Sequence, residues 1–86
     1  MSWFYRDNKI RAAELNTMAY LIWNRRSKDI FNKLEVRLAN PNDRKSPFIV
    51  LRGDGTRSEP IKRTKQVQKY IRRFYNDILY ESAAKS

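Results

Sequence analysis

Cationic side chains dominate the second half of this 86-residue chain. Between Arg44 and Arg73 there are ten Lys and Arg residues and only two acidic residues, so this window carries +8 of the total charge of +10. A concentrated surface of one sign attracts polyanions, and nucleic-acid phosphates are the commonest polyanions that small proteins bind. The sequence therefore predicts contact with the phosphate backbone of a nucleic acid, with RNA and DNA close to equally favoured.

The candidate contact residues fall into three groups along the chain. One group lies in a loop, one flanks a predicted hairpin turn, and one begins before the last predicted helix and continues along its outer face. Since a helix N-terminus carries unpaired N–H groups and a partial positive charge, we expect a phosphate to bind near Thr64. The full set is Arg44, Lys45, Arg52, Arg57, Lys62, Arg63, Thr64, Lys65, Lys69, Arg72 and Arg73.

Aromatic side chains offer a second kind of contact, because exposed rings can stack on nucleobases. Three rings fall on predicted apolar faces and are expected to pack in the core: Phe48, Tyr70 and Phe74. Three others fall off those faces and are better candidates for stacking or for a protein contact: Tyr5, Tyr75 and Tyr80.

Enzymatic chemistry has little support in the sequence. The chain contains no His and no Cys, which removes the usual general base and the strongest nucleophile. The carboxylates of Glu35, Asp43 and Asp54 are scattered, without the spacing of a metal site or of an acid/base pair. We therefore expect a non-enzymatic protein without a cofactor or a metal.

The absence of Cys also excludes a disulfide framework, which favours an intracellular location in the cytoplasm, nucleoid or nucleus. The longest apolar run, Met18–Trp23, has six residues. Since a membrane-spanning helix needs about 20 such residues, no membrane partner is expected.

The first half of the chain predicts a helix followed by a strand. Asp7 or Asn8 can cap a helix that reaches about Arg26. Residues 27–39 fit either a second helix or a strand, and we assign helix or turn to about residue 33 and a strand over residues 34–39.

The second half predicts a hairpin and a final helix. Residues 47–52 form the clearest strand, and Gly53-Asp54-Gly55 supplies the positive backbone angles of a tight turn. The return strand, about residues 56–62, contains Pro60, which restricts it to a sheet edge. Thr64 is the expected cap of an amphipathic helix that runs from residue 65 to about residue 82.

Together these elements predict one small α+β domain over residues 1–86. It has two layers, formed by an N-terminal helix, a three-stranded antiparallel sheet and the C-terminal amphipathic helix. We expect residues 1–6 and 83–86 to be flexible. This order of elements resembles double-stranded RNA-binding domains and the small Alu-domain proteins of the signal recognition particle. The likeness lies in element order alone, since residues 62–65 only loosely echo the Lys-Lys-x-Ala-Lys entry to the last helix of the former.

An alternative function is a protein–protein interaction module or regulatory subunit that binds an acidic protein surface, with a homodimer as one form. Tyr20 and Trp23 widen the apolar arc of the first helix, and Trp3-Phe4-Tyr5 adds aromatic side chains near the N-terminus. Exposed apolar surfaces of this kind usually mark contacts. The nucleic-acid hypothesis, in contrast, requires the cations to converge on one surface that carboxylates do not neutralise.

Overall fold

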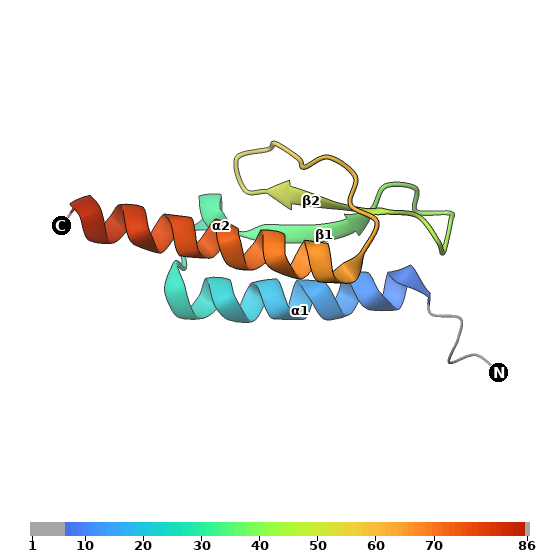
Figure 1. The fold of residues 1–86 in the computed structure, drawn as a ribbon, viewed down its shortest axis with the longest axis horizontal. Helices are drawn as coiled ribbons and strands as arrows, with labels where there is room; N and C mark the ends of the chain where they lie inside the picture. The colour runs from blue at the N-terminus through green and yellow to red at the C-terminus, as the bar shows by residue number, and fades with distance from the viewer. Residues whose placement is uncertain (1–6, 86) are drawn as a thin grey trace.

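Residues 7–85 are described by the structure, a computed structural model, and their side chains are described as far as Asp77. The elements follow in the order α1 (Asn8–Arg26), the short 3-10 helix η2 (Ile30–Asn32), β1 (Leu34–Leu38), β2 (Phe48–Arg52) and α2 (Thr64–Lys85) (Figure 1). The predicted α+β class is confirmed, with a helix at each end and an antiparallel sheet between them.

The helix α1 begins and ends where the sequence predicts. Asp7 is the N-cap, and its carboxylate accepts the N–H of Lys9 at 2.8 Å. The buried residues Ala12, Leu15 and Ala19 lie on the side of α1 that packs against β1 and α2. Two neighbours in the same chain therefore cover α1.

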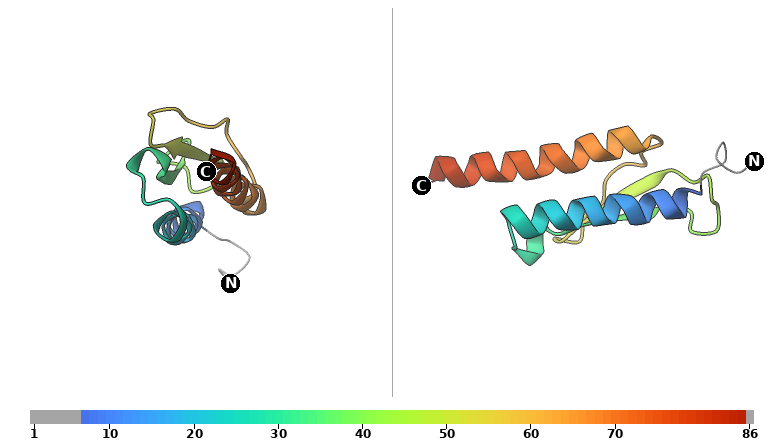
Figure 2. Two further views of the ribbon diagram at one scale, coloured as in Figure 1. Left: turned by 90° about the vertical axis from the view of Figure 1, so that its left-hand side faces the viewer. Right: turned by 90° about the horizontal axis from the view of Figure 1, so that it is seen from below.

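Both helices cover one face of the sheet. They lie side by side and run in the same direction, and α2 extends past the end of α1 (Figure 2). Val36 on β1 lies opposite Val50 on β2, and both side chains point into the core. The buried apolar residues are Ala12, Leu15, Ala19, Leu34, Val36, Leu38, Phe48, Val50, Val67, Ile71 and Tyr75.

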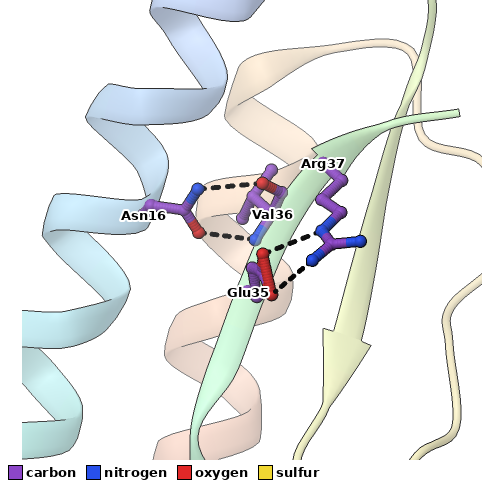
Figure 3. A network of polar contacts seen from close by, with 4 residues as sticks. All are labelled: Asn16, Glu35, Val36 and Arg37. Carbon is purple, nitrogen blue, oxygen red and sulfur yellow. Dashed lines mark hydrogen bonds and ion pairs between the residues drawn. The ribbon is translucent and has the colours of Figure 1, made fainter. Parts of the chain in front are cut away.

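The free edge of β1 is covered by a side chain of α1. Asn16 donates from Nδ2 to the carbonyl of Val36 at 2.9 Å and accepts the N–H of Val36 through Oδ1 at 2.6 Å (Figure 3). An unpaired strand edge can pair with a strand of another chain. Asn16 occupies the pairing position at Val36, while Glu35 and Arg37 form an ion pair of 2.8 Å on the exposed face of β1.

The predicted third strand is wrong, because the sheet has two strands. The return segment touches β2 only at two isolated bridges, Leu51 with Arg57 and Phe48 with Ile61. These bridges are three residues apart on β2 and four apart on the return segment. The return segment therefore contains one extra residue, which is a β-bulge.

A side-chain hydroxyl completes the pairing of β2 at the bulge. Pro60 lies within the bulge and has no N–H, which suits a position at the sheet edge. The N–H of Val50 donates to the hydroxyl oxygen of Ser58 at 2.9 Å, while the N–H of Ser58 donates to the carbonyl of Val50. A side chain thus replaces one backbone partner of β2.

The two glycines of the hairpin turn have different roles. Gly55 adopts the expected positive backbone angle, with φ of 92°. The φ of Gly53 is not positive, contrary to the prediction, and this residue is required for close packing. A Cβ there would collide with the carbonyl oxygen of Ile30 and lie 2.7 Å from that of Phe31. Gly53 therefore allows η2 to pack directly on the end of β2.

Candidate nucleic-acid interface

The helix α2 presents an apolar side to the core and a cationic side to solvent. Val67, Ile71 and Tyr75 recur every fourth residue and are buried. From residue 60 to residue 76 the chain contains six Lys and Arg residues and no Asp or Glu. All six are exposed and define what we call the α2 basic face: Lys62, Arg63, Lys65, Lys69, Arg72 and Arg73.

The charges of the α2 basic face are not neutralised within the described part of the chain. Ion pairs join Arg37 to Glu35 at 2.8 Å and Arg44 to Asp7 at 3.7 Å, and neither pair involves α2. Among residues 7–77, no hydrogen bond from a side chain of the α2 basic face is formed either. These six cations are therefore available to an external anion.

A broad open groove of about 980 Å³ runs along this side of α2. Tyr70 and Phe74 line it beside Lys69 and Arg73. Both rings are half-buried and pack against the core, as the sequence predicts, while they also face the groove. The groove therefore combines cationic groups with two aromatic surfaces.

Arg52 has a different environment from the cations on α2. Its Nε donates to the hydroxyl of Tyr70 at 2.8 Å, and its Nη1 donates to Oγ1 of Thr56 at 2.7 Å. The Thr56 hydroxyl in turn donates to Asp54 at 2.6 Å, and this hydrogen bond is the main cause of a lowered pKa of Asp54. Arg52 therefore ties the hairpin turn to α2, which is a structural role.

The other cations of the loop and hairpin are separated from one another. Arg57 lies opposite Leu51, on the sheet face that the helices leave open. Arg44 and Lys45 lie in the loop between β1 and β2, at the end of the molecule where α2 begins (Figure 1). The predicted set thus divides into the α2 basic face, a loop pair near the start of α2, Arg52 bonded to Tyr70 of α2, and Arg57 on the open face of the sheet.

Thr64 is the first residue of α2 and not its cap. The carbonyl of Arg63 accepts the N–H groups of Gln66 and Val67 at 3.1 and 3.2 Å, so Arg63 occupies the cap position. Thr64 is half-buried and lines a pocket of about 370 Å³ between the helices, together with Arg11. The helix and its cap therefore each lie one residue earlier than predicted.

Tyr75 is buried, so the expectation of a stacking role for this ring is wrong. Its side chain is 1% exposed, and its hydroxyl donates to the carbonyl of Asn32 at 2.7 Å. Burial raises the pKa of Tyr75 to about 12. The other two candidates, Tyr5 and Tyr80, lie outside the residues whose side chains are described.

Arg26, which the sequence did not single out, lies beside α2. Its Nη1, in the last turn of α1, is 3.5 Å from Oδ1 of Asn76 on α2. Arg26 is visible in the sequence, but only the packing of α1 against α2 shows that it extends the positive surface.

No protein-family model, curated protein or solved structure matches this chain. Neither α1 nor the described part of α2 is apolar enough over its length to cross a membrane. The case for a function therefore depends on the charge, exposure and partners of the residues described above.

Proposed function

We propose that this chain is a small non-enzymatic protein that binds the phosphate backbone of RNA or DNA through the α2 basic face. The observation that carries the proposal is the set of six exposed cations on and before one helix, none of them paired with a carboxylate in the described residues. Surface charges of one sign without internal partners are the usual electrostatic footprint of a nucleic-acid ligand.

The packing of α2 gives this surface a fixed geometry. Val67 and Ile71 anchor the helix in the core, so the cations on its other side keep their relative positions. From Lys65 to Arg73 the helix rises about 12 Å, at about 1.5 Å per residue. The unpaired N–H groups of the first turn add a partial positive charge next to Arg63. Contacts of this kind position a nucleic acid without reading its sequence.

The salt dependence of binding tests the electrostatic basis of the proposal. The probes are an RNA duplex and a DNA duplex of about 20 base pairs, titrated with the full chain by fluorescence anisotropy. If about six phosphates are neutralised, the affinity falls roughly a thousandfold between 50 and 200 mM salt. An affinity that stays constant over this range would contradict the proposal, and the tighter duplex at equal salt identifies the preferred nucleic acid.

A matched pair of variants locates the site. The triple change Lys69→Glu, Arg72→Glu and Arg73→Glu is expected to weaken binding by more than about a hundredfold, because three phosphate contacts become repulsive. The control, Lys9→Glu, Lys28→Glu and Arg37→Glu, alters net charge equally on other surfaces and is expected to weaken binding less than about fivefold at 150 mM salt. Circular dichroism checks that both variants fold. Equal losses in the two variants would show that net charge alone, and no site on α2, attracts the ligand.

A further inference from the structure

A second surface lies across the molecule from the outer side of α2. In the view along the long axis, η2 and α2 are on opposite sides (Figure 2). Around η2, a groove of about 580 Å³ is formed between α1, the start of β1 and the end of β2. We call this region the η2 surface and define it by Tyr20, Ile30, Phe31, Lys33 and Leu51.

Large apolar side chains are exposed on the η2 surface. Ile30 is 64% exposed, Phe31 66% and Tyr20 48%, and Leu51 is half-buried. These side chains come from three elements that are distant in sequence, so their proximity is a product of the fold. Clusters of exposed apolar side chains of this kind are typical of binding surfaces.

The backbone of η2 is held in place from several directions. The carboxylate of Asp29 accepts the N–H of Phe31 at 3.0 Å, and Nε1 of Trp23 donates to the carbonyl of Asp29 at 2.7 Å. The hydroxyl of Tyr75 donates to the carbonyl of Asn32, and Gly53 lets the turn rest on the end of β2. A turn fixed in this way presents Ile30 and Phe31 without a large loss of conformational entropy on binding.

The charge beside these apolar groups is positive. Lys28 and Lys33 are exposed and form no ion pair among residues 7–77, and Nζ of Lys33 lies 5.3 Å from the ring of Trp23. Two carboxylates are also near: Glu35 pairs with Arg37, whereas Asp29 keeps its negative charge while it accepts the N–H of Phe31. Lys28 and Lys33 therefore outnumber the one carboxylate that has no cationic partner. The complement of the η2 surface is therefore a ligand that presents apolar side chains flanked by carboxylates.

Two features restrict the form of that ligand. Addition of a strand to β1 is blocked at Val36, because Asn16 bonds both of its outward backbone groups. A second copy of this chain would bring together two molecules of charge +10. A helix of an acidic partner that inserts side chains into the groove needs no free backbone group of β1 and carries no like charge.

We infer that the η2 surface docks an acidic amphipathic helix of a partner protein. The apolar stripe of that helix packs on Ile30 and Phe31, and its carboxylates face Lys28 and Lys33. This inference is independent of nucleic-acid binding, because it uses none of the residues of the α2 basic face. It assigns the molecule two separate binding surfaces.

A designed peptide of about 18 residues serves as the probe, long enough to form a helix. It carries Leu at helical spacing and Glu at the other positions, and a matched peptide carries Lys in place of Glu. Amide chemical shifts of the full chain are followed by NMR. We expect the Glu peptide to shift the signals of Tyr20, Ile30, Phe31 and Leu51, and the Lys peptide to shift none of them. Shifts confined to α2 would overturn the inference.

Substitutions separate the η2 surface from general attraction to a basic protein. Phe31→Ser is expected to lower the affinity for the Glu peptide about tenfold, a loss typical of a central apolar anchor. The control Ile10→Ser removes an equally exposed apolar side chain, 60% exposed, from the other end of α1 and is expected to leave the affinity unchanged. Equal affinities of the two variants would refute docking at η2.

Two further outcomes complete the test. The triple variant of Lys69, Arg72 and Arg73 is expected to bind the Glu peptide with unchanged affinity while its affinity for nucleic acid falls. The two proposals can therefore fail separately. Loss of the peptide in that variant would place the docking site on α2 and overturn the inference. Shifts at Ile30 and Phe31 that depend on protein concentration without peptide would identify a second copy as the occupant, which also overturns it.

Discussion

Two arginines of this molecule, Arg52 and Arg73, show how the same residue type serves two purposes. The guanidinium of Arg52 is enclosed by the hydroxyls of Tyr70 and Thr56, and it connects the hairpin turn to α2. Arg73 lies on the exposed side of α2 and has no hydrogen-bond partner in the described residues. Charge counting gives the two residues equal weight, whereas the hydrogen bonds of Arg52 assign it to the fold and leave Arg73 as the one exposed to solvent.

The same contrast separates whole regions. Around the sheet, polar groups form hydrogen bonds with one another, including Asn16 with Val36 and Tyr75 with Asn32. On the α2 basic face the cationic groups have no such partners among residues 7–77. Paired groups should therefore affect stability when they are changed, and unpaired ones should affect binding.

The largest effect on stability is expected for Asn16→Ala. This change leaves the N–H and carbonyl of Val36 without their partner, which should lower the free energy of unfolding by about 2–3 kcal/mol. Urea denaturation followed by circular dichroism measures the loss. The nearby control Thr17→Ala removes an exposed hydroxyl on α1 and should cost less than about 0.5 kcal/mol. Equal stability of Asn16→Ala and the wild type would show that the edge of β1 does not need this clamp.

Exchange of the two arginines for alanine tests the contrast directly. Arg52→Ala should lower the free energy of unfolding by about 1–2 kcal/mol, because two hydrogen bonds between the hairpin and α2 are lost. Arg73→Ala should leave stability within about 0.5 kcal/mol and weaken duplex binding about three- to tenfold. Thermal denaturation and anisotropy titration of both variants provide the comparison. If Arg52→Ala weakened binding and Arg73→Ala lowered stability, the assignment of these two side chains would be wrong.

Tyr75→Phe should lower the free energy of unfolding by about 1 kcal/mol at neutral pH, because the hydrogen bond to Asn32 is lost. The same change should remove the dependence of stability on pH that Tyr75 causes at high pH. The pKa of Tyr75 is raised from 10.0 to about 12 in the folded protein, so the folded state retains a proton that the unfolded state loses. Its contribution to stability is complete below pH 10 and declines by about 1.4 kcal/mol per pH unit as the pH rises towards 12. The urea midpoints of the two proteins should therefore converge as the pH rises to roughly 11 and then cross, because this decline exceeds the about 1 kcal/mol that the hydroxyl contributes at neutral pH. A constant difference would show that Tyr75 ionises with an ordinary pKa.

The smallest effect is expected for Arg57→Ala. Because Arg57 lies on the open face of the sheet, its loss should weaken duplex binding less than about twofold and leave stability unchanged. The same anisotropy titration measures it. A loss of affinity as large as that of Arg73→Ala would show that Arg57 in the hairpin belongs to the binding site.

The helices and both strands were predictable from local chemistry. Asp7 caps α1 as its short carboxylate suggests, and the alternation of Leu34, Val36 and Leu38 matches their burial on β1. Residues 30–33 contain a single 3-10 turn before the strand, in agreement with the assignment of helix or turn there.

Features that depend on contacts between distant segments were not predictable in the same way. Pro60 indicated that the return segment lies at a sheet edge, but the bulge, with the hydroxyl of Ser58 as a substitute partner, was not indicated. The role of Asn16 depends on a strand 20 residues away. Tyr75, in contrast, carried a usable signal, because it follows Val67 and Ile71 at intervals of four residues and therefore shares their buried side.

The parallel course of α1 and α2 has an electrostatic consequence near the surface. Each helix contributes a macrodipole whose positive pole is its N-terminus, and both poles lie at the same end of the molecule (Figure 1). The carboxylate of Asp7 caps α1 and offsets its pole, whereas Lys62 and Arg63 lie at the N-terminus of α2, so dipole and formal charges add there. Because salt screens such charges within about 8 Å, the start of α2 attracts an anion at close range.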